Sequence, residues 1–286
     1  MSKFSIAALP EVFVSDGTIS GAVYEAARRG QLRKLGSRLY TRNLEEAPER
    51  LVRRNWDTLI ASYYPDAIIA DRTALESKPA EDGSVFLISA KRRDTELPGL
   101  VLRPRPGPGA LDSDRVFGGA RLASTARAYL ENLRPSRGRK GRTSRVVERS
   151  ELERRLDAMI RQQGEVGVNR LRDDARRIAP QLDYEAEADE LDNLIGSLLG
   201  TREAEMQSDI GKARLAGHPF DPDRVRLFEA LFAALRETMV ERRPVPDRTA
   251  EANATLAFFE AYFSNFIEGT EFSVEEAAQI VFDGDI

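Results

Sequence analysis

The sequence predicts an α+β first half followed by an all-α second half. Up to about residue 133, short strand-like apolar runs alternate with short helices, whereas the strand signals vanish after a basic connector. The charge also reverses: Met1–Arg145 holds 26 basic and 17 acidic residues, and Val146–Ile286 holds 17 basic and 30 acidic residues. The net charge of −4 therefore joins a module of +9 to one of −13, which indicates two modules with different partners.

The composition excludes several classes of protein. With no cysteine and one histidine, the chain cannot form disulfides, thiolate metal sites or a multi-histidine metal centre, and a cytoplasmic setting is expected. No apolar run reaches the roughly 18 residues that a membrane span needs, and the N-terminus lacks a signal-peptide pattern. We therefore expect no membrane partner and no metal site.

Residues 1–45 are predicted to form a winged helix. Ser20 caps a helix over residues 21–29 that stops at Gly30, and two short runs around Gly36 indicate a tight hairpin. A helix followed by a basic hairpin is typical of the end of a winged helix, whose cations can neutralise DNA phosphates. The alternative is a winged helix used for protein contacts. The candidate DNA-binding residues are Arg28, Arg29, Arg33, Lys34 and Arg38, with Arg42 nearby.

Residues 46–133 are predicted to form a small α/β domain. Its expected helices cover residues 48–62 and 120–133, and its expected strands cover residues 67–70, 83–90 and 98–105. Residues 134–149 are predicted to form a basic linker, because six basic residues and no acid lie between positions 134 and 145. A flexible connector is favoured there over a mobile phosphate-contacting arm.

Residues 150–242 are predicted to form a helical domain. A capping box of Ser150 and Glu153 opens a helix to about residue 163, and the stretch 201–216 is expected to be irregular. Further helices are expected at residues 166–178 and 184–199, and another begins at Asp221 and Pro222. That last helix carries apolar residues at helical spacing, which predicts a buried seam: Val225, Phe228, Phe232, Leu235 and Met239.

An acidic run in this domain offers the one candidate cation site. A divalent cation could be held by carboxylates at this spacing, which would suit an enzyme with an unrecognised site. A solvated helix face is the favoured interpretation. The residues are Glu185, Glu187, Asp189, Glu190 and Asp192.

Residues 249–286 are predicted to hold one long helix to about Glu268 and a short helix capped by Ser273 and Glu276. A carboxylate at the C-terminal end of a helix opposes the helix dipole, so an arginine partner would rationalise Glu268. The alternative is a solvated acidic face that ends at the glycine cap Gly269. An apolar stripe indicates that the long helix packs on something: Leu256, Phe259, Phe263 and Phe266.

The segment from Ser264 to Gly269 matches S/T-x-x-x-E-G/N, the inhibitory motif of Fic proteins, and its surroundings resemble the helix before the Fic core. Fic cores transfer AMP from ATP to a hydroxyl group. The resemblance implies that Glu268 blocks the productive pose of the γ-phosphate, with Ser264 as its companion on the helix face and Gly269 completing the motif. ATP and a divalent cation are expected only together with a Fic core.

The Fic catalytic signature H-P-F-x-x-G-N-G-R is absent, because only its first three letters occur, at His218. Without the glycine loop the backbone amides cannot converge on a diphosphate, so His218 is expected to be an ordinary loop residue and the chain not to be an enzyme. The front half resembles the winged helix and following domain of AbiE-type antitoxins, at residues 28–41, 54–56 and 67–76.

These observations predict a non-catalytic regulator of a Fic-type AMP-transferase or toxin–antitoxin system. Its expected partners are a Fic core, in cis or in trans, and DNA, and a homo-oligomer is possible. The alternative is a winged-helix transcription regulator whose helical half dimerises or senses a ligand, with no Fic partner.

Overall fold

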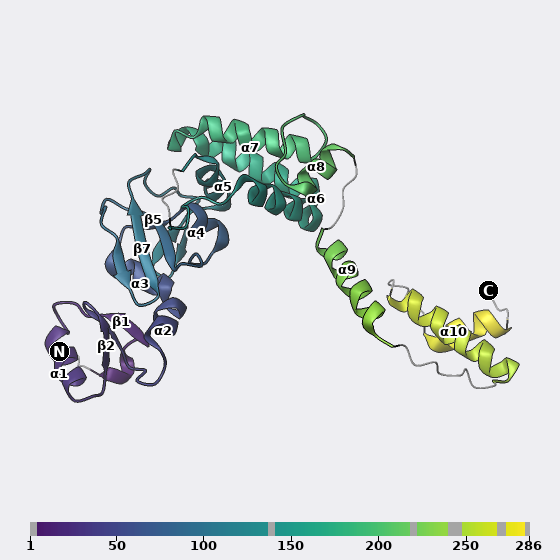
Figure 1. Cartoon of the computed structure of the whole chain (residues 1–286), viewed down its shortest axis with the longest axis horizontal. Coiled ribbons are helices and arrows are strands. Elements are labelled where there is room, and N and C mark those ends of the chain that lie inside the picture. Colours follow the sequence, from purple (N-terminus) through teal and green to yellow (C-terminus); the bar gives the residue numbers. More distant parts are fainter. Residues whose placement is uncertain (1–4, 137–140, 218–221, 240–247, 268–272, 284–286) are drawn as a thin grey trace. The chain divides into compact units, whose positions relative to one another are not determined.

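The computed structural model describes residues 5–136, 141–217, 222–239, 248–267 and 273–283. The chain divides into two compact units, Met1–Pro222 and Asp223–Ile286. Strands and helices mix in the first part of the chain and helices alone follow, as Figure 1 shows, so the predicted fold class is confirmed.

A three-stranded antiparallel sheet of order β1-β3-β2 begins the first unit. The predicted helix and basic hairpin are both present, and Arg38 at the hairpin turn has a φ of 60°. The elements are a 3-10 turn at Ile6–Ala8, β1 (Val12–Val14), α1 (Ser20–Arg28), β2 (Arg33–Gly36) and β3 (Leu39–Thr41).

The two faces of this sheet bury different side chains. On one face Phe13 joins Val23 of α1 in a small apolar cluster. On the other face Val12 and Leu39 belong to the main core of the next domain. The expected winged-helix region 1–45 thus shares a core with the residues that follow.

A six-stranded mixed sheet of order β6-β7-β5-β4-β9-β8 follows. The β5–β7 and β4–β9 pairs are parallel, and the other pairs are antiparallel. The strands are β4 (Ile68–Ile69), β5 (Ser84–Ile88), β6 (Thr95–Leu97), β7 (Leu100–Arg105), β8 (Arg115–Phe117) and β9 (Ala120–Leu122). The helices are α2 (Pro48–Arg54), α3 (Trp56–Tyr63), α4 (Asp71–Glu76) and α5 (Thr125–Leu133).

Two predicted helices of this domain need correction. The helix expected at 48–62 is two helices, because Asn55 leaves helical geometry with φ −104° and ψ 20°. The helix expected at 120–133 begins only at Thr125, after its N-cap Ser124. Residues 120–122 instead form β9, because they pair in parallel with β4 and bury alternate side chains.

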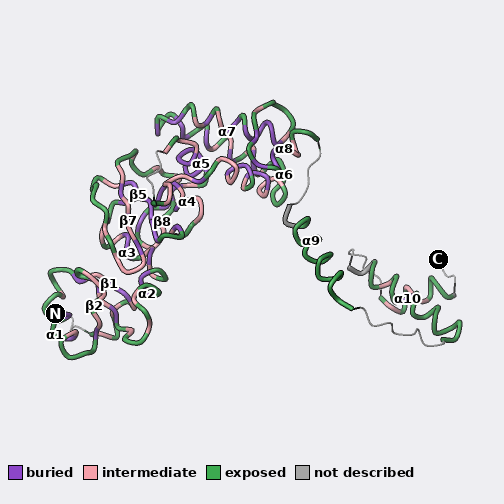
Figure 2. The backbone as a smooth tube through the Cα atoms, in the orientation of Figure 1, coloured by how far each residue is buried: buried purple, intermediate pink, exposed green. Residues whose placement is uncertain are grey.

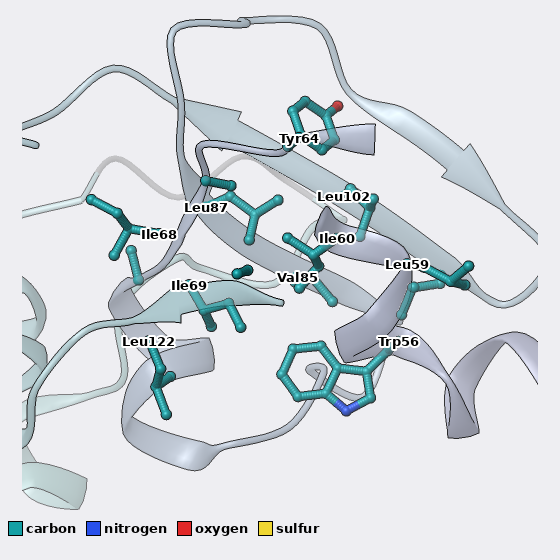
Figure 3. Packing of buried hydrophobic residues seen from close by; sticks show 14 of the residues in the cluster. Trp56, Leu59, Ile60, Tyr64, Ile68, Ile69, Val85, Leu87, Leu102 and Leu122 are labelled. Atoms are coloured by element: carbon teal, nitrogen blue, oxygen red, sulfur yellow. The ribbon is translucent and has the colours of Figure 1, made fainter. Parts of the chain in front are cut away.

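The core of this domain lies between α3 and the sheet. Figure 3 shows the α3 side chains Trp56 and Ile60 facing Ile69, Val85 and Leu102 from three strands. Burying side chains of this size contributes about 1.5–3 kcal/mol each, so this cluster fixes the relative placement of helix and sheet.

The basic connector is not a free linker along its described length. The Thr143 amide donates a hydrogen bond to the Asp82 carboxylate over 3.2 Å, and Val147 is buried in the helical core. Burial acts to raise the pKa of Asp82, but hydrogen bonds from Ser84 and Thr143 lower it to about 2. Within residues 141–148, Thr143 therefore contacts the α/β domain and Val147 packs in the helical core.

Three helices complete the first unit: α6 (Arg149–Leu182), α7 (Glu185–Leu198) and α8 (Asp209–Leu215). α6 is two helical segments joined at Gly164, whose φ of 65° and ψ of −170° are not helical. That break falls between the two helices predicted at 150–163 and 166–178. Helix α7 was predicted at the same place.

Two expectations for these helices are wrong. Ser150 and Glu153 form no capping box, since α6 begins at Arg149 and the buried Glu153 carboxylate accepts hydrogen bonds from the amides of Gln207 and Ser208. The stretch 201–216 is not wholly irregular, because the Ser208 hydroxyl accepts a hydrogen bond from the Gly211 amide and caps α8.

Helix α9 (Pro222–Glu237) begins at the last residue of the first unit and otherwise belongs to the second unit, which also contains α10 (Ala250–Ile267), α11 (Val274–Ala278) and a short π-helix at Gln279–Asp283. The capping box of Ser273 and Glu276 is present as predicted. The helix expected from Pro222 is present, and so is the described part of the helix expected at 250–268, but α9 from Asp223 on groups with the second unit rather than with the helical domain predicted at 150–242. The predicted buried seam of α9 is exposed, as Figure 2 shows, and its Phe228 side chain is 65% exposed.

Candidate functional site

Three of the five candidate DNA-binding residues are exposed cations that form no ion pair with the described residues. Arg28 and Arg29 lie exposed at the C-terminal end of α1, and Lys34 lies exposed on β2. Within the described part of the chain, none of the three has an ion-pair partner. They are therefore available to phosphate oxygens.

The other two candidates hold the backbone. Arg33 donates to the carbonyl oxygens of Leu44, over 3.2 Å, and of Glu46. Arg38 donates from Nε to the carbonyl oxygen of Ser15 over 2.8 Å. These guanidinium groups stabilise the loops on either side of the hairpin, which residue type alone does not reveal.

Negative charge lies at the opposite end of α1. The Asp16 carboxylate accepts hydrogen bonds from Thr18 and from the Ile19 amide at the turn before α1, and these bonds lower the pKa of Asp16. An ionised carboxylate belongs at a helix N-terminus, where the dipole is positive. The cations without an ion-pair partner lie away from this carboxylate, at the C-terminal end of α1 and on the hairpin.

A buried charge network in the α/β domain was not predicted. Asp71 is fully buried and accepts bidentate hydrogen bonds from Arg105, at 2.7 and 2.8 Å, and a third from Arg145 at 2.8 Å. The Asp71 amide donates to the buried Glu131 carboxylate over 2.8 Å, and Arg127 Nε donates to the same carboxylate over 2.9 Å. Asp71 has a φ of 52°, so this backbone is held in the left-handed region by its contacts.

Electrostatics set the protonation tendencies in this network. Burial raises the pKa of Glu131, the charge of Asp71 raises it further, and Arg127 acts in the opposite direction. Burial lowers the pKa of Arg105, but the hydrogen bond to Asp71 together with the negative charges of Asp71 and Glu131 outweighs burial and raises the pKa. Because Asp71 and Glu131 are fully buried, the network ties the connector and α5 to the sheet rather than offering carboxylates to a substrate.

The acidic run on α7 lies against arginines. Glu187 pairs with Arg134 over 3.5 Å, Glu190 pairs with Arg149, and Asp192 pairs with Arg176 over 2.9 Å. No group of three or more ligating side chains within the described ranges could hold a metal ion. At these three positions the run is ion-paired rather than only solvated.

The inhibitory motif falls partly beyond the described residues. Ser264 lies exposed near the end of α10, whereas Glu268, Gly269 and the loop residue His218 are outside the described ranges. One side of α10 is covered, since Phe258 is buried and its ring lies 5.2 Å from that of Phe282. The predicted stripe is exposed at Leu256, Phe259 and Phe263, the three of its members whose burial the structure describes, so the covered side of α10 is a different one.

Comparisons of the chain with family models, curated proteins and solved structures found no match. The resemblances to Fic and AbiE-type proteins therefore stay predictions from the residues. In the part of the chain that the structure describes, no helix is both long enough and apolar enough to cross a membrane.

Proposed function

We propose that this chain is a non-catalytic regulator that acts in the cytoplasm, with a DNA-contacting N-terminal module and C-terminal helices that engage a partner protein. The resemblance around Ser264 supports a Fic catalytic core as that partner, which would supply the site for ATP and a divalent cation. No catalytic role is assigned to a residue of this chain.

The observation that carries the DNA assignment is the set of free cations at Arg28, Arg29 and Lys34. A cation that neutralises a phosphate releases a condensed counterion, so binding falls with salt at a slope of about 0.9 per contact. Tyr24, exposed on the same helix, can add an apolar contact to a sugar or a base.

Replacing Arg28, Arg29 and Lys34 together by alanine should weaken DNA binding and flatten its salt dependence. Three lost phosphate contacts should reduce the slope of log K against log salt by about 2–3. The measurement is fluorescence anisotropy with duplex DNA at several salt concentrations. Arg33 is left intact because it holds the backbone at Leu44 and Glu46.

The matched control replaces three exposed cations outside the hairpin, Lys78, Arg92 and Arg93, by alanine. It removes the same charge and should leave most of the affinity. Equal losses in the two triple variants would show that only net charge matters, and no binding by the unaltered chain at low salt would exclude the DNA assignment.

Exposed apolar side chains on α9 and α10 support the partner-binding role. Phe228 and Phe232 lie one turn apart on α9, and Phe259 and Phe263 lie one turn apart on α10, all of them exposed in the single chain. Apolar surface of this kind marks protein interaction sites. The same observation favours a second candidate, a DNA-binding transcription regulator that dimerises through these helices.

Replacing Glu268 by glycine separates the two candidates. Added to the matching Fic core, or tested with that core attached, the Glu268→Gly chain should allow more AMP transfer than the unaltered chain, because the carboxylate no longer blocks the γ-phosphate. The measurement is label transfer from α-labelled ATP, with Glu260→Gly, a change at a glutamate of α10, as the control. Equal AMP transfer with the Glu268→Gly chain and the unaltered chain would exclude the inhibitory role of Glu268. The dimerising transcription regulator would then be the remaining candidate.

A further inference from the structure

A cavity of about 390 Å³ lies in the first unit between the start of α5 and the second segment of α6. Its size is within the range of small-molecule sites. Its lining combines three arginines with hydroxyl groups and apolar side chains, and the two preceding functional assignments use none of these residues.

The cations around the cavity exceed the anions. Arg115 of β8 and Arg170 of α6 line the cavity and have no ion-pair partner within the described residues. Arg177 also lines it, but pairs with Asp174 over 2.6 Å. Two arginines thus remain unneutralised, which suits a dianionic group.

Hydrogen-bond donors meet these cations at the same place. Thr125 and Ala126 line the cavity as the first residues of α5, where backbone amides have no acceptor within the helix. The Ser113 hydroxyl oxygen is shielded from solvent and has no hydrogen-bond partner in the structure, and Ser113 also lines the cavity. The start of α5 and the Ser113 residue thus add polar groups to the lining that also holds Arg115 and Arg170.

The polar end of the cavity is held in place from within the domain. The buried Asp114 carboxylate accepts a hydrogen bond from the Ser124 amide, over 2.9 Å, and pairs with Arg127 over 2.7 Å. These contacts fix the N-cap of α5 before any ligand arrives. Met159, Leu171 and Ile178 provide an apolar wall in the same cavity.

We propose that this cavity binds a small organic phosphate, with the phosphate between Arg115, Arg170 and the α5 amides and the organic part against the apolar wall. This ligand site is independent of DNA binding and of the C-terminal helices. It would give the regulator a small-molecule input.

Titration calorimetry of the full chain tests the proposal with three probes: UMP, uridine and inorganic phosphate. UMP should bind most tightly, phosphate more weakly, and uridine without measurable heat. Arg170→Ala should weaken UMP binding at least about tenfold, as expected for a lost charged hydrogen bond. Arg154→Ala, also an exposed arginine of α6 but outside the cavity, should leave it unchanged.

Absence of binding by both UMP and phosphate at millimolar concentration would overturn the proposal, and so would equal affinities of the Arg170→Ala and Arg154→Ala chains. A duplex DNA titration separates the two sources of phosphate. If Arg170→Ala weakens DNA binding while UMP binds to neither chain, the cavity belongs to a DNA path instead. UMP should still bind the variant in which Arg28, Arg29 and Lys34 are replaced by alanine. UMP binding therefore tests the cavity whether or not the chain binds DNA.

Discussion

At the scale of single residues, arginines hold the buried carboxylates of the α/β domain. Arg127 is fully buried, pairs with Asp114 and Glu131, and donates to the carbonyl oxygens of Gly109 and Pro108. One side chain thus joins α5, the loop before β8 and the network around Asp71. Its guanidinium has five donors in a fixed planar arrangement, which a lysine cannot reproduce.

Replacing Arg127 by alanine should lower the free energy of unfolding by about 3–5 kcal/mol, because two buried carboxylates lose their cation. Chemical denaturation of the full chain measures this. Arg154→Ala removes a half-exposed pair with Glu151 and should cost less than about 1 kcal/mol. A similarly small loss for Arg127→Ala would mean that the buried network contributes little.

At the scale of elements, α6 bends at Gly164, and both of its segments contribute residues to the cavity beside α5. The first segment carries Glu153, which holds the turn before α8, and the second carries Arg170 and Leu171, which line the cavity. The bend depends on Gly164, whose backbone angles are open essentially to glycine alone.

Replacing Gly164 by alanine should destabilise the first unit by about 1–3 kcal/mol through backbone strain, although the added methyl group would meet no neighbouring atom. Thermal or chemical denaturation provides the measurement. Gly17→Ala is the control, since Gly17 also has open space but an ordinary φ, and it should cost nothing. No difference between the two variants would show that α6 relaxes without strain.

At the scale of the whole molecule, the chain consists of two units with different degrees of internal packing. Among the residues that the structure describes, the three buried apolar clusters lie within the first unit, Met1–Pro222. The second unit buries little: Phe258 is its one buried apolar side chain among the described residues. The second unit is therefore expected to contribute through contacts with other molecules more than through stability of the fold.

A chain that ends at Pro222 should keep the fold of the first unit and unfold within about 1 kcal/mol of the full chain, a shift of no more than about 2–4 °C in Tm. Circular dichroism melts of the two chains compare them directly. A drop in Tm of more than that range, or loss of cooperative melting, would show that α9 or α10 stabilises the first unit.

Several elements could be predicted from local sequence because their signals are local. The stop of α1 at Gly30, the break of α6 near Gly164 and the cap of α11 by Ser273 each depend on a few neighbouring residues. The short edge strands β6 and β8 could not be predicted, because their few residues form strands only through pairing with distant partners. For the same reason Ala120 and Leu122 were assigned to a helix.

The candidate DNA-binding site, too, could be predicted only in part from the sequence. The sequence by itself determined that an α+β half precedes a helical half, that cations gather at the end of α1 and the hairpin, and that no Fic anion loop is present. Only the tertiary structure decided that Arg33 and Arg38 hold backbone while Arg28, Arg29 and Lys34 stay free. It also decided which arginines surround a cavity. The physical reason is that charge and helical periodicity are properties of neighbouring residues, whereas the partner of a buried or half-buried charge is set by residues far apart in the chain.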